Sequence, residues 1–150
     1  MPGCYAPWTN IDITEQGTLG PCCKFRHSEY SSQPLNINKH SIAEYKASAV
    51  LEAVKEDFRN NKWPVGCVRC KVEEENNIKS KRELDYTRWQ QQYNDYNKDS
   101  GEFITASIAL GNTCNLTCVT CNAYSSSRWR KEHKQLTGDN IIPIHYYKND

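Results

Sequence analysis

Cysteine is the residue type that most limits what this chain can fold into. The 150 residues contain eight cysteines. They form two groups, Cys4, Cys22, Cys23, Cys67 and Cys70 first, and Cys114, Cys118 and Cys121 later. Only 37% of the residues are hydrophobic, which predicts a modest core that bound metal would help to stabilise.

The rest of the composition argues against several classes of protein. No stretch approaches the roughly 18 apolar residues of a membrane span, and Met1-Pro2-Gly3-Cys4 does not have the charged and apolar regions of a secretory signal. We expect a cytoplasmic protein, in which cysteines bind metal more often than they form disulfides. A secreted, disulfide-bonded domain is the alternative. The net charge of +1 offers no basic surplus, so neither nucleic acid nor membrane is expected as a partner.

The N-terminal segment has the pattern of a β-hairpin. Ile11 and Ile13 alternate with polar neighbours, Gln16-Gly17 suits a turn, and the segment 18–22 returns. Pro21 fits only an edge or the end of a strand. Such a hairpin can bring Cys4 and Cys22 close together.

Helices are predicted next. Ser41-Ile42-Ala43-Glu44 is a capping box for a short helix. A second helix is expected from about residue 48 to 60, because Leu51, Val54 and Phe58 share one face. The polar segment 94–102 resembles a linker, which gives predicted domains of 1–98 and 99–150.

After the linker, residues 103–110 have the pattern of a buried strand. Cys114, Cys118 and Cys121 follow at once, and Ser125-Ser126-Ser127 offers N-caps for a helix from about residue 128 to 136. The predicted fold class is therefore a small α+β N-terminal domain, a β-hairpin plus helices, followed by a β/α unit.

Charged residues between the two cysteine groups are assigned no function. Glu73-Glu74-Glu75 follows Cys70, and a run of this kind predicts a solvated helix face. Lys81 and Arg82 suggest a cationic site, but Glu83 and Asp85 offset their charge.

The later group, Cys114-x3-Cys118-x2-Cys121, is the strongest chemical motif in the chain. Three thiolates are one ligand short of a structural zinc site, whereas they suit a 4Fe–4S cluster that leaves one iron open. A zinc knuckle and a chance grouping are the alternatives. The motif, directly after a strand, resembles the signature of the radical S-adenosylmethionine (SAM) superfamily.

This resemblance implies a chemistry and several partners. The cluster on these three cysteines would bind SAM and cleave it reductively to a 5′-deoxyadenosyl radical, the chemistry of an oxidoreductase. Flavodoxin or ferredoxin would supply electrons, and the unknown substrate would be a peptide or a small molecule. No side chain is assigned as catalytic. The β/α unit would begin a partial barrel that residues 122–150 are too few to complete, so we expect this N-terminal part of an enzyme to be inactive alone.

The first cysteine group resembles the auxiliary cluster domains of radical SAM enzymes, called twitch or SPASM. The resemblance implies that Cys4, Cys22, Cys67 and Cys70 bind a second 4Fe–4S cluster, since a hairpin and a CxxC knuckle present two thiolates each. The spacing from Gly17 favours Cys22, although Cys23 could replace it. A four-cysteine zinc site remains open, and with it a non-catalytic zinc-binding interaction module.

Overall fold

A computed structural model describes residues 3–31, 33–97, 100–111, 114, 116–123 and 126–139. These form two compact units, residues 1–109 and 110–150. The elements in chain order are α1 (Ala6–Thr9), β1 (Asn10–Ile13), β2 (Leu19–Gly20), η1 (His27–Glu29), α2 (Ile42–Lys46), α3 (Ala49–Arg59), η2 (Val65–Cys67), α4 (Val68–Glu75), α5 (Lys81–Asn94), β3 (Thr105–Ile108) and α6 (Ser127–Thr137).

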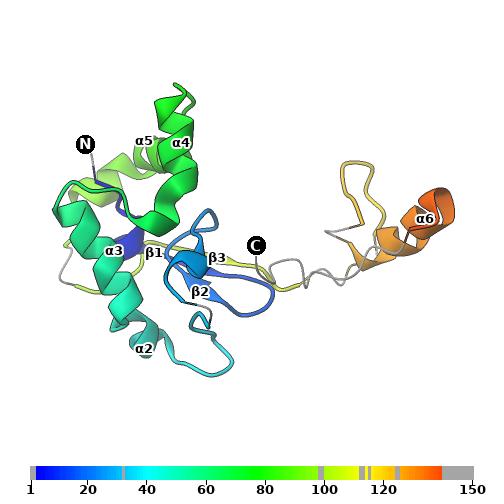
Figure 1. The fold of residues 1–150 in the computed structure, drawn as a ribbon, viewed down its shortest axis with the longest axis horizontal. Helices are drawn as coiled ribbons and strands as arrows, with labels where there is room; N and C mark the ends of the chain where they lie inside the picture. Colours follow the sequence, from blue (N-terminus) through cyan, green and yellow to red (C-terminus); the bar gives the residue numbers. More distant parts are fainter. Residues whose placement is uncertain are drawn as a thin grey trace. The chain divides into compact units, whose positions relative to one another are not determined.

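The first unit is built on a three-stranded mixed sheet in the order β2-β1-β3. The predicted hairpin is confirmed, because β1 pairs antiparallel with β2, with Ile13 opposite Leu19. Gly17 provides the turn with φ of +82°, a conformation that favours glycine. In Figure 1, α4 and α5 lie together at one end of this unit and α2 at the other, with the strands between them.

The predicted helix starts are also confirmed. Ser41 forms the capping box of α2 with Glu44, and Ser48 caps α3 by accepting from the Leu51 amide. Leu51, Val54 and Phe58 are all buried on one side of α3. These starts follow from local chemistry, since a side-chain oxygen satisfies an otherwise unpaired amide in the first turn.

Two hydrophobic clusters form the core of the first unit. The first consists of Trp8, Phe25, Val54 and Phe58. The second consists of Ile11, Leu19, Tyr45 and Leu51. Helix α3 contributes Val54 and Phe58 to the first cluster and Leu51 to the second. Through the second cluster it packs against Ile11 of β1 and Leu19 of β2.

The strand β3 differs from its prediction in burial. It pairs parallel with β1, with Asn10 opposite Thr105 and Ile13 opposite Ile108, so it belongs to the first unit. The compact units divide after residue 109, and the domain boundary at 98/99 stays a prediction. The expected burial is wrong, since β3 is an edge strand outside both clusters and Ile108 is 57% exposed. A small α+β fold is what the structure shows, and no barrel is present in the described residues.

Candidate iron–sulfur site

Four cysteines of the first group come from three separate places in the fold. Cys4 precedes α1, Cys22 follows β2, and Cys67 and Cys70 lie at the end of η2 and in the first turn of α4. A spacing of three residues at a helix start puts two side chains on one face. The Arg26 amide donates to the Gly66 carbonyl at 3.0 Å, which links the segment after Cys22 to the segment before Cys67.

These cysteines lie against the first hydrophobic cluster. Cys4, Cys22 and Cys67 pack against it, and Cys70 is 9% exposed. Packing beside them is close, because a Cβ on Gly66 would lie 2.5 Å from a ring carbon of Phe25. The site is therefore shielded by apolar side chains.

Burial and mutual proximity make these thiols hard to ionise without a ligand. Burial raises the pKa of Cys4 to about 12, with Cys22 and Cys70 adding to the rise, while the Ala6 amide and Arg82 act against it. Burial also raises the pKa of Cys22 to about 12, again with a contribution from Cys70, while the Lys24 amide opposes it. Ligand binding requires thiolates, so metal uptake here must release protons.

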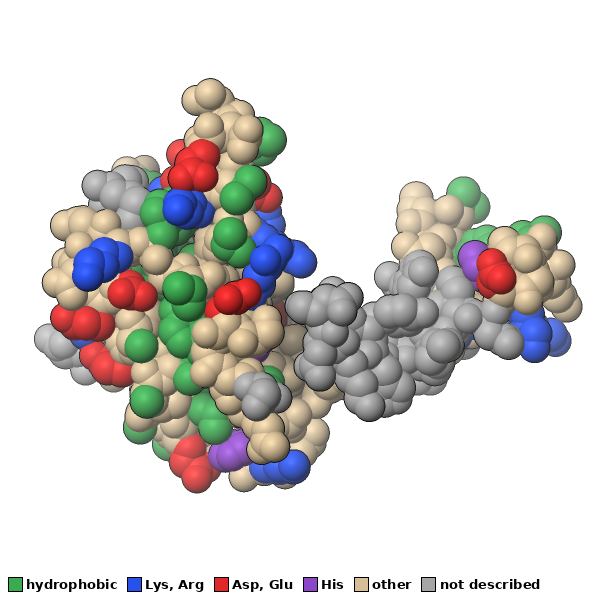
Figure 2. Space-filling view, in the orientation of Figure 1, with side chains coloured by type: hydrophobic (Ala, Val, Ile, Leu, Met, Phe, Trp, Pro, Cys, Tyr) green, Lys and Arg blue, Asp and Glu red, His purple; other side chains and the backbone are tan. Residues whose placement is uncertain are grey.

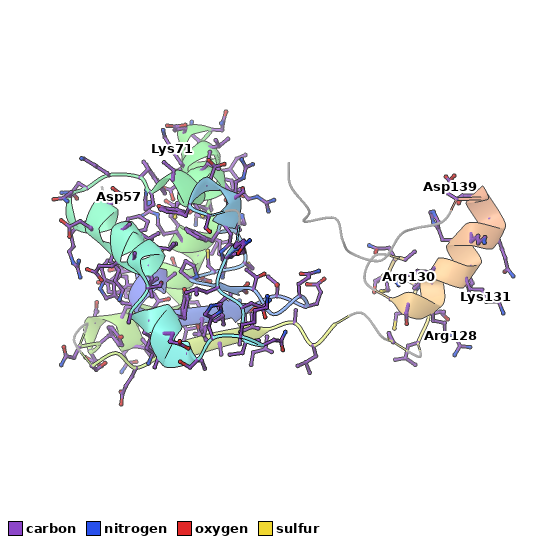
Figure 3. The ribbon with its side chains drawn as sticks, turned by 60° about the horizontal axis from the view of Figure 1, so that its bottom comes forward. Asp57, Lys71, Arg128, Arg130, Lys131 and Asp139 are labelled. Carbon is purple, nitrogen blue, oxygen red and sulfur yellow. The ribbon has the colours of Figure 1, made fainter. Side chains whose placement is uncertain are left out.

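The Cys67 thiol, like those of Cys4 and Cys22, has a raised pKa. Burial raises the pKa of the Cys67 thiol, and so do its neighbours Cys4, Cys22 and Cys70. Asp57, labelled on α3 in Figure 3, adds to that rise. All four thiols thus interact with one another, whereas the neighbouring Cys23 side chain is exposed.

The donor set fits a 4Fe–4S cluster. Four cysteines match its ligand number, and the amides of Ala6 and Lys24 hydrogen-bond to the thiols of Cys4 and Cys22. Among the described residues, no three or more His, Cys, Asp or Glu side chains gather as a site for one metal ion. A four-iron cluster offers each cysteine a different iron, so its ligands need not meet at one point.

Two cations at the start of α5 face these cysteines. Arg82 acts on Cys4, and Lys81 acts on Cys22 and Cys23. Ser80 begins α5 with a capping box that includes Glu83. The Ser80-x-x-Glu83 spacing in the sequence is the signal of this capping box, which the net charge of the segment does not reveal.

The acidic run after Cys70 is only partly solvated, contrary to the prediction. Glu73 forms an ion pair with Lys24, and Glu74 forms one with the buried Arg82. Only Glu75 matches the expectation, because its contact with Lys71 is long, at 3.8 Å, and exposed. Sequence spacing alone could not reveal the partner at position 24.

The second cysteine group lies in the second unit, on a loop before α6. Ser127 Oγ accepts from the Cys114 amide at 3.1 Å, and Trp129 Nε1 donates to the Cys118 carbonyl at 3.1 Å. The Cys121 amide donates to the Cys118 carbonyl at 2.9 Å. Helix α6 starts as predicted, although the Ser126 side chain donates to the Leu116 carbonyl and does not cap the helix.

The same loop is also tied to α6 further along. Arg130, labelled in Figure 3, donates from Nε to the Ala123 carbonyl at 3.3 Å. Cys118 is exposed, and Cys114 and Cys121 are half-buried. Residue 115, between Cys114 and Cys118, and residues 112, 113, 124 and 125 on either side of the motif lie outside the described residues. The predicted joint role of the three thiols therefore remains a prediction.

One family model matches part of the chain. Residues 4–71 match the family model of SPASM, an iron-sulfur cluster-binding domain. The match spans all four clustered cysteines, so the resemblance to an auxiliary cluster domain is confirmed at this level, and iron–sulfur binding by the segment is supported. The chain has no match among the curated proteins or the solved structures compared with it.

Surface features add little to this assignment. On the face of the first unit drawn in Figure 2, acidic and basic side chains are interspersed, with hydrophobic side chains between them. Across the described residues, no helix has both the length and the apolar character needed to cross a membrane.

Proposed function

We propose that this chain is the cluster-binding N-terminal part of a radical SAM enzyme. One 4Fe–4S cluster would be held by Cys4, Cys22, Cys67 and Cys70, and another by Cys114, Cys118 and Cys121. The observation that supports the proposal most is the match of residues 4–71, which include all four cysteines of the first site, to an iron-sulfur cluster-binding domain. Three of these cysteines also pack against one hydrophobic cluster.

The first unit's residues have defined roles in this proposal. The thiols would lose their protons and ligate iron. The Ala6 and Lys24 amides, which already face Cys4 and Cys22, would donate hydrogen bonds to the ligating sulfurs. Trp8, Phe25 and Phe58 would exclude water, and both hydrogen bonding and exclusion of solvent tune such a centre.

In the second unit, α6 would orient the ligand loop. Ser127 and Trp129 hold the backbone at Cys114 and Cys118, which supports the proposal that this loop presents three thiolates. When bound, a cluster with one open iron supplies SAM binding and one-electron chemistry. Flavodoxin or ferredoxin would be the reductant, a peptide or a small molecule the substrate, and the cytoplasm the compartment.

Anaerobic reconstitution of the full chain with iron and sulfide tests the proposal. We expect about eight iron atoms per chain, four for each cluster, with visible charge-transfer absorption. Cys114→Ala should remove one cluster and spare the other. Tightly bound zinc without iron would contradict the proposal and indicate a zinc-binding interaction module.

A matched pair of neighbouring variants tests the ligand set of the first site. Cys22→Ser should abolish iron binding there, whereas Cys23→Ser should not, because Cys22 packs against the core and Cys23 is exposed. Equal iron loss in both variants, or loss only with Cys23→Ser, would overturn the choice of Cys22.

A further inference from the structure

Arg82 is a buried cation beside the first cysteine site. Its side chain is on the first turn of α5, the residue is 8% exposed, and it lines a cavity of about 280 Å³ together with Cys4. The SPASM match ends at residue 71, so α5 lies outside the matched segment. This cation is therefore supplied by a part of the chain that the family match does not cover.

The guanidinium of Arg82 is held from several sides. Its Nε donates to Glu74 Oε1 at 2.9 Å, and its Nη2 donates to Glu74 Oε2. Ser80 Oγ donates to the same Glu74 Oε1 at 2.6 Å. The Trp63 ring centroid lies 5.2 Å from the guanidinium carbon, a cation–π distance. Arg82 is thus a fixed positive charge with one carboxylate bonded to it.

A bound cluster would place negative charge in this shielded site. Four thiolates outweigh the positive charge of an oxidised 4Fe–4S core, and reduction adds one more electron. Buried net charge is costly unless an opposite charge lies close to it. Arg82 lines the same cavity as Cys4, and Glu74, which forms an ion pair with Arg82, neutralises part of its charge.

We propose that Arg82 compensates the charge of the cluster held by Cys4, Cys22, Cys67 and Cys70, and that Glu74 positions Arg82 and limits its effect. This inference rests on the proposed function, because it assumes that the cluster binds there. It assigns α5 a role in setting the reduction potential, which depends on the net charge around such a centre.

The two members of this ion pair should shift the potential in opposite directions. A nearby positive charge favours the reduced, more negative cluster. Arg82→Met should therefore lower the reduction potential, and Glu74→Gln should raise it. Arg82→Lys, which keeps the charge, should stay closer to the parent protein than Arg82→Met. General loosening of the site would not produce opposite signs.

The experiment is a redox titration followed by electron paramagnetic resonance. Cys114, Cys118 and Cys121 are replaced by Ser in the full chain, so that only the first site carries a cluster. Arg88→Met is the control, because Arg88 is an exposed residue on the same helix. A second readout is the rate of iron loss to a chelator, which we expect to rise roughly tenfold in Arg82→Met.

The outcomes separate this inference from the proposed function. Opposite shifts in Arg82→Met and Glu74→Gln, with no shift in Arg88→Met, support the inference. Iron uptake with unchanged potentials, or with shifts of the same sign, overturns the inference alone. Absence of iron in the parent protein overturns both. If Arg82→Met does not fold, Glu74→Gln and Arg82→Lys decide, since the first must raise the potential and the second must stay near the parent.

Discussion

Gly66 is the residue at which the first site is packed most closely. A Cβ there would lie 2.5 Å from the Phe25 ring and 2.9 Å from the Arg26 carbonyl oxygen. The Phe25 ring could turn away, but the Arg26 carbonyl belongs to the backbone of the segment that follows Cys22 and cannot move as easily. The absence of a side chain at Gly66 therefore allows the segments around Cys22 and Cys67 to approach closely.

Gly66→Ala should lower the free energy of unfolding by about 1–3 kcal/mol, the usual cost of overpacking. Chemical denaturation followed by tryptophan fluorescence measures the change. Gly3→Ala is the control, because nothing lies within 4 Å of a Cβ there. Equal stability of the two variants would show that the contact at Gly66 is not tight.

At the scale of elements, α5 depends on its N-cap. Ser80 is fully buried and bonds both the Glu83 amide and the Glu74 carboxylate, whereas the capping residue of α2, Ser41, is exposed. Ser80 thus joins the start of α5 to α4.

Ser80→Ala should cost about 1–2 kcal/mol of unfolding free energy, and Ser41→Ala about 0.5–1 kcal/mol. The difference arises because Ser80 also satisfies a partner in α4. Thermal melting of the two variants, followed by circular dichroism, compares the two caps directly. A larger loss in Ser41→Ala would contradict the assigned role of Ser80.

The link between α4 and α5 should also be sensitive to acid. Partial burial raises the pKa of Glu74, but hydrogen bonds from Arg82 and Ser80 outweigh it and hold the pKa below its ordinary value of 4.5. Because the folded state binds this proton less readily than the unfolded state, the stabilisation is present above that value and is lost as the pH falls below it.

Glu74→Gln removes this titrating group. Between neutral pH and pH values below 4.5, the parent chain should lose more stability than Glu74→Gln does. Urea unfolding at a series of pH values measures both slopes. Parallel slopes would show that Glu74 has the same pKa in the folded and unfolded states.

Local signals explain what could be predicted at this scale. Ser41, Ser48 and the Leu51–Phe58 spacing specify α2 and α3 from neighbouring residues alone. The Glu74–Arg82 pair crosses a helix boundary, and the pairing of Asn10 with Thr105 spans most of the chain. Composition and periodicity carry no signal for such contacts. In the first cysteine group, residue spacing and the family pattern predict Cys4, Cys22, Cys67 and Cys70 as ligands, and the family match covers the segment that contains them.

For the whole molecule, β3 decides where the first unit ends. It adds four register pairs to β1, and flanking bonds join the Ile104 amide to the Thr9 carbonyl at 2.6 Å and the Ala109 amide to the Ile13 carbonyl at 2.8 Å. Without this strand, β1 would have an unpaired edge.

A chain of residues 1–109 should therefore be more stable than one of residues 1–98. Loss of β3 removes these backbone bonds and leaves a sheet edge open to aggregation. Denaturation midpoints and sedimentation of the two truncated chains test this expectation. Equal stability would place the end of the unit at residue 98.

The central claim is that the first unit binds an iron–sulfur cluster. Its most direct test is metal and sulfide analysis of the full chain after Cys114, Cys118 and Cys121 are replaced by Ser and the protein is reconstituted anaerobically. We expect about four iron and four sulfide per chain, both lost when Cys70→Ser is added. Stoichiometric zinc without sulfide would contradict it.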